Sequence, residues 1–325
     1  MQRNTSTIRS IQSPCSIQDH WQFINQLNQY SFFHTPNWIQ VLTETYRQYK
    51  NSSFIVTFKN GKSALIPAIS VCKFGGLVKS IHSMPFNTYG GLLSNDEITS
   101  QESFEIGNLL FQSRVIKTSL TPDPSISKQF ISGTPYSTAV KRETQLLPLN
   151  LKYEDIWTQK YDGKNRNQIR KARNSSIHIE VNPTQAGSMF SELYHRNSEL
   201  RGSNQTLVYS SELFTNLEIY PEQVKFYMAY HSGDLISAIL VLYGKNHAIY
   251  WAAANKPEAK SLCANQLLLD YAIQQSCEMN IGWFDFGASH NMPQLWTFKE
   301  GFGPEPKAYS ILSSQLWMSH KIYED

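Results

Sequence analysis

One lysine and one aspartate stand out in residues 283–303, because each is surrounded by aromatic side chains. Asp285 lies between two phenylalanines, and Lys299 follows Phe298 and comes shortly before a Gly-Phe-Gly. An ammonium can stabilise the oxyanion that forms when an amine attacks an ester or thioester carbonyl. A carboxylate can orient that amine, or accept its proton if burial raises the carboxyl pKa. The pair is therefore compatible with acyl transfer.

Each of these residues also has a structural interpretation. Lys299 could extend from a loop beside a strand, with its ammonium in solvent. Alternation places Asp285 on the opposite face of a strand from the neighbouring rings, where it could accept hydrogen bonds from the turn at Gly287 and Ala288. His290 is a second candidate base, although a single histidine in a loop is more often a surface residue. The residue types alone leave these alternatives open.

A basic run over residues 160–173 is the second group of side chains that could do chemistry. Its basic residues outnumber its single acid, Asp162. On a helix Arg166, Arg170 and Arg173 fall on one stripe, and guanidinium groups suit phosphates. A solvated helix face is the alternative, since most charge runs have that role. The lack of balancing acids favours anion binding.

Composition restricts the classes of function. The chain has 325 residues, of which 41% are hydrophobic and 17% charged, and a net charge of +3. This small charge argues against DNA binding by bulk attraction. The four cysteines are scattered and lack the spacing of metal ligands, so no metal is expected. The sequence shows no leader and no apolar run of membrane length, which predicts a cytoplasmic protein without a transmembrane segment.

The apolar pattern predicts a similar order of elements twice. The first half is expected to contain helices at 18–30, 36–50 and 100–112, a hairpin at 52–71, a loop containing Tyr89, and a strand at 143–149. The second half is expected to contain helices at 153–173, 185–201 and 262–279, a hairpin at 224–243, and strands at 246–254, around Asp285 and at 308–317. This order indicates an α+β protein with domains over residues 1–150 and 151–325 and a cleft between them.

Three motifs in this order resemble those of the Fem-like (FemAB-type) acyl/aminoacyltransferases of the GNAT superfamily. They are PFNTYGG in the first half, KNRNQIRKAR in the basic run, and FDFG…FKEGFG at the paired acid and lysine. The resemblance extends from about Phe33 to Trp317. It implies two tandem GNAT-like units with mixed, mainly antiparallel sheets.

The resemblance also implies a function and a set of site residues. The activity would be transfer of an acyl or aminoacyl group to an amine of a sugar or peptide precursor of the cell envelope or surface polysaccharide. Lys299 matches the family's acyl-transfer centre, and Asp285 is expected to serve the amine. The expected substrate-binding residues are Tyr89, Arg166, Arg170, Arg173, His290 and Phe298. These residues would bind a small or lipid-linked acceptor that carries a phosphate, and the protein could contact a membrane peripherally.

The implied co-substrate is acyl-CoA or aminoacyl-tRNA, and no tightly bound cofactor is expected. GNAT enzymes usually hold the CoA pyrophosphate in a Gly-rich turn, but the corresponding residues 255–266 include no glycine. Weak CoA binding through Lys256, Lys260 and Ser261 is therefore expected. Two other functions stay open, a non-catalytic Fem-like binding module and a peripheral anionic-lipid-binding protein. Both predict ligand binding without acyl transfer.

Overall fold

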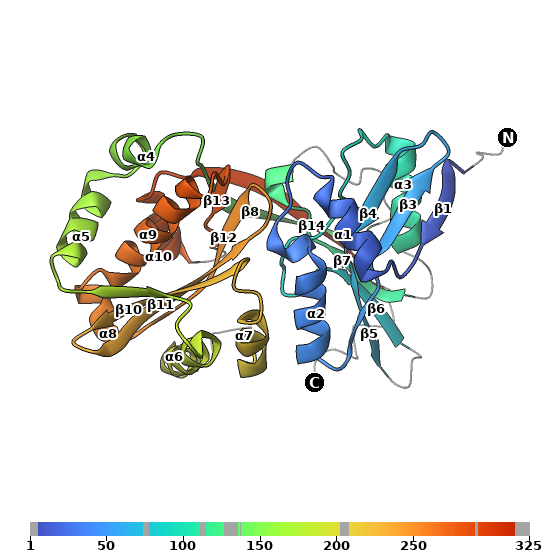
Figure 1. Cartoon of the computed structure of the whole chain (residues 1–325). Helices are drawn as coiled ribbons and strands as arrows, with labels where there is room; N and C mark the ends of the chain where they lie inside the picture. Colours follow the sequence, from blue (N-terminus) through green and yellow to red (C-terminus); the bar gives the residue numbers. More distant parts are fainter. Residues whose placement is uncertain are drawn as a thin grey trace. The chain divides into compact units, whose positions relative to one another are not determined.

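The computed structural model describes residues 6–73, 78–110, 115–126, 136, 138–201, 208–289 and 292–315 (Figure 1). Contacts group the chain into unit 1, Met1–Arg142 with Ala308–Asp325, and unit 2, Glu143–Lys307. The domain boundary expected at residue 150 stays a prediction. The contacts differ from it in two respects, because the division falls after Arg142 and the end of the chain joins unit 1.

Unit 1 contains two groups of strands. The first runs in the order β1 (Ile8–Gln12), β3 (Phe54–Phe58), β4 (Ser63–Ile66), with antiparallel neighbours. The second runs β2 (Tyr49–Asn51), β5 (Ile69–Lys73), β6 (Val78–Ser83), β7 (Val115–Leu120), β14 (Glu305–Gln315). Of these, β6 and β7 are parallel, whereas the other pairs are antiparallel.

Helices cover both faces of the small sheet in unit 1. The strand β3 alternates buried and half-buried residues, and its buried Val56 belongs to one core cluster with Ile106 of α3 (Ser100–Leu110). Leu65 of β4 belongs to a second cluster with Ile24 of α1 (Ile17–Asn25). The other helices in the described part of unit 1 are α2 (Pro36–Thr45) and the short 3-10 turns η1 (Phe32–His34) and η3 (Pro124–Ile126). The hairpin expected around residues 60 and 61 is confirmed.

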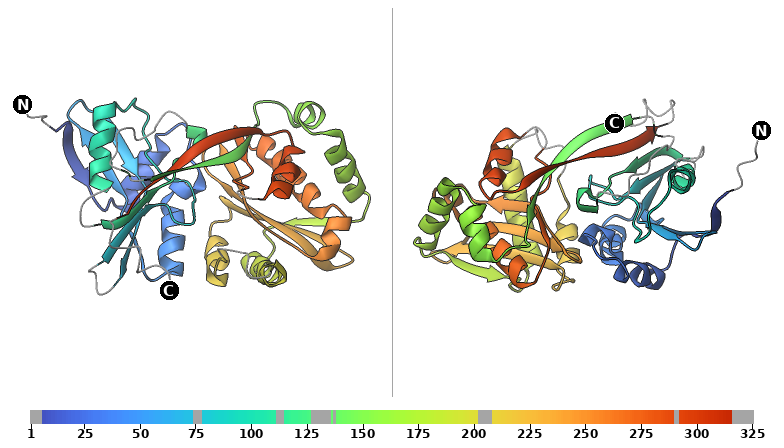
Figure 2. Two further views of the ribbon diagram at one scale, coloured as in Figure 1. Left: turned by 180° about the vertical axis from the view of Figure 1, so that it is seen from behind. Right: turned by 90° about the horizontal axis from the view of Figure 1, so that it is seen from above.

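Unit 2 is a mixed sheet with helices on both faces. Its strands run in the order β8 (Thr138–Pro148), β13 (Trp283–Asp285), β12 (His247–Asn255), β11 (Asp234–Tyr243), β10 (Val224–His231), β9 (His178–Val181). Only the β12–β13 pair is parallel in this described group. The helices α6 (Ala186–Arg201) and α7 (Ser211–Leu217) cover one face, and α5 (Gly163–Arg173) and α9 (Ala264–Glu278) cover the other (Figures 1 and 2).

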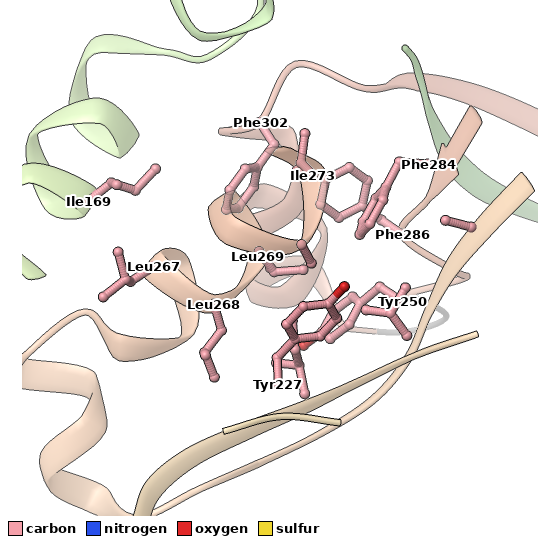
Figure 3. Packing of buried hydrophobic residues seen from close by; sticks show 14 of the residues in the cluster. Ile169, Tyr227, Tyr250, Leu267, Leu268, Leu269, Ile273, Phe284, Phe286 and Phe302 are labelled. Atoms are coloured by element: carbon pink, nitrogen blue, oxygen red, sulfur yellow. The ribbon is translucent and has the colours of Figure 1, made fainter. Parts of the chain in front are cut away.

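One core of unit 2 lies between α9 and the sheet. Figure 3 shows Leu269 and Ile273 of α9 near a group of aromatic rings that includes Phe286 and Phe302. Tyr227 extends from the strands below, and its hydroxyl lies 2.8 Å from that of Tyr243. A buried hydroxyl pair of this kind satisfies two polar groups that would otherwise be costly to bury.

The structure corrects two expectations for unit 2. The helix expected over 153–173 is two helices, α4 (Tyr153–Gln159) and α5, because Asp162 accepts a hydrogen bond from the Asn165 amide and starts a new helix.

The loop position considered for Lys299 is also wrong. Lys299 lies in α10 (Pro293–Glu300), a helix too short to show a clear apolar period. The short helices α7 and α8 (Pro257–Ser261) were not predicted separately either. Within the described residues, no helix is both long and apolar enough to cross a bilayer.

The Gly-Phe-Gly segment anchors α10. Phe302 is fully buried, and its ring centroid lies 5.4 Å from that of Phe286 and 5.2 Å from that of Tyr161. Gly303 has a φ of 74°, and a Cβ atom at this position would clash with the carbonyl oxygen of Lys160. Only glycine therefore fits where the chain leaves α10.

We expect Gly303→Ala to destabilise unit 2 through both backbone strain and this clash. Gly233→Ala is the matched control, because Gly233 has a φ of 86° but a Cβ there would meet no atom within 4 Å. The control should lose about 1–2 kcal/mol from strain alone, and Gly303→Ala should lose about 1–3 kcal/mol more. Urea unfolding curves measure both values. Equal losses in the two variants would show that the backbone at Lys160 moves away from the new Cβ atom without a cost in stability.

Candidate active site

Lys299 projects from α10 toward the turn that follows β13. Only 2% of the residue is exposed, and its Nζ donates hydrogen bonds to the carbonyl oxygens of Gly287 at 2.8 Å and Ala288 at 3.4 Å. Burial lowers the Lys299 pKa to about 8, although the charge of Asp285 acts in the opposite direction. Lys299 is thus an ammonium at neutral pH that can release its proton at mildly alkaline pH.

Asp285 holds the turn that receives the Lys299 ammonium. Its Oδ1 accepts hydrogen bonds from the Thr144 hydroxyl at 2.5 Å and from the Gly287 amide at 2.7 Å. Its Oδ2 lies 3.8 Å from Nε2 of His247, and both residues are fully buried. The contact with Gly287 is the structural alternative that the sequence allowed for Asp285.

Two buried polar residues near Lys299 were not identified from the sequence. Ser289 directly follows the turn and is 6% exposed, and no described residue bonds its Oγ. Gln145 donates a hydrogen bond of 3.4 Å to the carbonyl of Trp296 in α10, whereas its buried Oε1 has no partner among the described residues. Because an unsatisfied buried polar atom is costly, both atoms are suited to a ligand or to water. The Gly-Ala-Ser turn was visible in the sequence, but the burial of its serine was not.

Next to this turn β12 has an open edge at residues 252–254, where no described strand pairs with it on the side of β13. The parallel ladder between β12 and β13 ends with the pair Ile249 and Asp285, but β12 continues to Asn255. The chain after β13 stays close, since a Cβ on Gly287 would lie 3.4 Å from the Tyr250 carbonyl oxygen. Residues 252–254 can therefore offer backbone groups to an extended ligand on the side where β13 has ended.

The three arginines of the expected phosphate-binding stripe make contacts within unit 2. Arg173 forms an ion pair of 2.7 Å with the buried Asp270. Arg166 donates hydrogen bonds to backbone carbonyls of residues 157–161. The guanidinium of Arg170 lies 5.7 Å from the ring centroid of Trp157. Binding of phosphate by Arg166 or Arg173 would compete with these contacts, so their substrate role stays a prediction that these contacts do not favour.

Another residue of the same helix reaches the turn expected to hold phosphate. Lys171 donates a hydrogen bond of 2.8 Å from Nζ to the carbonyl oxygen of Ser261, in α8. Lys256 is the residue before α8, and the exposed Lys260 lies within it. These residues come just before the N-terminus of α9, where Asn265 has a buried Oδ1 without a described partner. Lys171 was part of the basic run, but the sequence did not identify it as a site residue.

The remaining predicted site residues lie in different places. Phe298 is half-buried in unit 2, with its ring centroid 5.8 Å from that of Phe302. Tyr89 is buried in unit 1, with its ring centroid 5.9 Å from that of Tyr309. His290 lies outside the described residues. Among the described residues, no group of three or more His, Cys, Asp or Glu has the arrangement of a metal site.

The low pKa of Lys299 predicts a specific dependence of stability on pH. Because its pKa is about 8 in the folded protein and 10.5 ordinarily, the unfolded chain binds more protons between these pH values. The free energy of unfolding of the wild type should therefore rise relative to that of Lys299→Met by up to about 3 kcal/mol between pH 8 and 10.5. Denaturant titrations of both proteins across this range measure the difference. A constant difference would mean that the folded-state pKa is not lowered.

Comparison with known proteins agrees with the fold. Residues 163–300 match the family model of the acetyltransferase (GNAT) domain, which includes Lys299, Asp285 and Lys171. No curated protein matches the sequence.

Three solved structures resemble the whole chain. FemX has a TM-score of 0.74 at 11% identity, with 98% of this chain and 100% of that chain covered. L-PGS from Bacillus licheniformis has a TM-score of 0.53 at 13% identity, with 86% and 91% covered. A tandem GNAT protein from the clavulanic acid biosynthesis pathway has a TM-score of 0.51 at 11% identity, with 94% and 98% covered. At these identities the likeness concerns the fold. Residues 163–300 carry a GNAT acetyltransferase domain, and the fold of the chain is similar to that of FemX and of a tandem GNAT protein, as the resemblance drawn from the sequence implied.

Proposed function

We propose that this protein transfers an acyl group from a CoA thioester to an amine, with Lys299 at the reaction centre. The observation that carries the proposal is a buried ammonium next to the point where β12 and β13 part. A positive charge in a site of low exposure interacts strongly with an oxyanion, because little water screens it.

The open edge of β12 and the start of α9 would hold the donor. The amide groups of an extended pantetheine arm can pair with backbone groups of residues 252–254, as an added strand does. The N-terminus of α9 attracts negative charge, and Lys171, Lys256 and Lys260 add cations near it. The match to the GNAT acetyltransferase family supports CoA as the donor, with aminoacyl-tRNA as the alternative.

The reaction would be direct attack without a covalent enzyme intermediate. The amine nitrogen forms a bond to the thioester carbon, and the carbonyl oxygen becomes an oxyanion that the Lys299 ammonium and the Ser289 hydroxyl stabilise. Collapse of this intermediate breaks the carbon–sulfur bond and releases CoA as thiolate. With a pKa of about 8, Lys299 can give its proton to the thiolate and regain one from the former amine.

Asp285 would act in this scheme as a positioning residue. Its carboxylate is fully buried and bonds Thr144 and Gly287, so its contacts fix the turn whose carbonyls accept the Lys299 hydrogen bonds. This role replaces that of a base for the amine, which would need a more accessible carboxylate. The proposed acceptor is an amine of a sugar or peptide precursor of the cell envelope, supported by the resemblance of the motifs to the Fem-like family.

Lys171 should contribute to donor affinity. Lys171→Met removes the cation at the turn before α9, whereas the neighbouring Arg170→Gln removes a cation that lies over Trp157. We expect Lys171→Met to weaken CoA binding by about fivefold, because one exposed ion contact contributes about 1 kcal/mol to the binding free energy. Arg170→Gln should change the affinity less than twofold. Calorimetric titration with CoA measures both. Equal affinities in the two variants would remove Lys171 from the donor site.

Lys299→Met is the main test of the proposed reaction. The variant keeps the apolar stem, so donor binding should persist while the single-turnover rate of thiol release from acetyl-CoA falls about 10²- to 10³-fold. Lys307→Met is the control, because Lys307 is an exposed residue of β14 outside the site. Unchanged turnover in Lys299→Met would contradict the mechanism. CoA binding by the wild type without any thiol release, in the presence of a panel of amines, would favour the non-catalytic binding module.

A further inference from the structure

Unit 1 contains a cavity of about 360 Å³ that the acyl-transfer chemistry does not use. One wall comes from residues 90–93, a second from residues 122–126, and a third from residues 308–310 of β14. Lys141 of β8 completes the lining. All these residues belong to unit 1, so the cavity can be considered independently of the Lys299 site. Its volume lies at the lower end of the range for small-molecule sites.

Backbone hydrogen bonds fix the first two walls against each other. The Gly90 amide donates to the Thr121 carbonyl at 2.8 Å, and the Gly91 amide donates to the Ser83 hydroxyl at 2.7 Å. Nε2 of the buried His34 lies 3.0 Å from the Gly90 carbonyl oxygen. The cavity is therefore built from restrained backbone, and a ligand would meet a largely formed site.

Asp123 supplies a carboxylate oxygen that has no partner among the described residues. The residue lines the cavity and is 6% exposed. Its Oδ1 accepts hydrogen bonds from the Ser125 amide at 2.8 Å and the Ser125 hydroxyl at 2.6 Å. Its Oδ2 is buried and no described residue bonds it. Since an ionised carboxylate only accepts hydrogen bonds, the group that satisfies Oδ2 must be a donor, and an ammonium adds a favourable charge interaction.

The other lining groups define the rest of a ligand. Leu92 and Leu93 are buried, and with Ile126 they give the cavity an apolar surface. Tyr309 adds an aromatic ring. Lys141 is exposed, so its ammonium can reach an anionic group at the solvent side of the cavity.

We propose that this cavity binds a compact zwitterion with an apolar body, namely an apolar amino acid or short peptide. Its ammonium donates to Oδ2 of Asp123, its apolar part contacts Leu92, Leu93 and Ile126, and its carboxylate pairs with Lys141. A ligand of this class uses the carboxylate, the apolar surface and the ammonium that line the cavity. A purely apolar ligand would not supply a hydrogen-bond donor to Oδ2.

Three probes of similar shape test each part of the proposal. L-leucine carries both charges, L-leucinamide lacks the carboxylate, and 4-methylpentanoate lacks the ammonium; L-alanyl-L-leucine tests the longer ligand. Calorimetric titration of the full chain should show that L-leucine or the dipeptide binds. L-leucinamide should bind at least about threefold more weakly than L-leucine, and 4-methylpentanoate at least about tenfold more weakly.

Two variants assign these differences to residues. Asp123→Asn keeps an oxygen for Ser125 but places an NH₂ donor where Oδ2 was, so it should weaken L-leucine or dipeptide binding by at least about tenfold. Lys141→Met should remove the preference for L-leucine over L-leucinamide, and Lys50→Met, an exposed lysine of β2 outside the cavity, should not. Thermal unfolding of each variant checks that it is folded.

The proposal would be overturned if neither L-leucine nor the dipeptide bound at 10 mM, roughly the weakest affinity of interest for one satisfied charge pair. It would also be overturned if folded Asp123→Asn bound them as the wild type does, which would mean that water satisfies Oδ2. Because these measurements use no acyl donor, their failure is distinguishable from failure of the proposed transferase reaction.

Discussion

The burial of one ammonium is the constraint on which the site depends. Lys299 is almost fully buried, and a buried charge is costly unless it is hydrogen-bonded. The carbonyls of Gly287 and Ala288 stabilise its ammonium by accepting its hydrogen bonds. Both carbonyls belong to a turn that Asp285 stabilises by accepting a hydrogen bond from the Gly287 amide. Asp285 is in turn held by Thr144 on the neighbouring strand β8. The charge at the proposed reaction centre thus depends on residues from three separate segments of unit 2.

The fold supplies what this arrangement needs. The strand β13 ends at Asp285 while β12 continues, and this creates the open strand edge beside the buried charge. Helix α10 brings Lys299 back to the end of β13. The buried Phe302 fixes the helix to the core, where its ring packs near Phe286 (Figure 3) and Tyr161. The aromatic surroundings noticed in the sequence therefore have two roles. They form the core that holds α10, and they exclude the water that would otherwise screen the charge.

Local patterns explain how much of this could be predicted from the sequence. Alternation placed Phe284 and Phe286 on one face and Asp285 on the other, and the two rings do lie 5.1 Å apart in one core. The hairpin turns were also identifiable, because their sequences are local signals. The motif around Lys299 identified the residue but not its helix, since α10 has only 8 residues.

Features that depend on distant residues could not be predicted. Arg173 was expected to face phosphate, but it pairs with Asp270, which is 97 positions away in the chain. Lys171 seemed equivalent to its basic neighbours until the fold placed it at Ser261. The burial of Ser289 and Asp123, and therefore the significance of their unsatisfied oxygens, likewise follows only from tertiary packing.

A crystal structure with a ketone analogue of acetyl-CoA, in which a methylene group separates the carbonyl from sulfur, would test the central claim most directly. We predict that the analogue's arm lies along residues 252–254 and that its carbonyl oxygen lies about 2.7–3.1 Å from Nζ of Lys299, the distance expected for an oxyanion donor. A bound analogue whose carbonyl lies away from Lys299, with the lysine still bonded only to Gly287 and Ala288, would contradict the account.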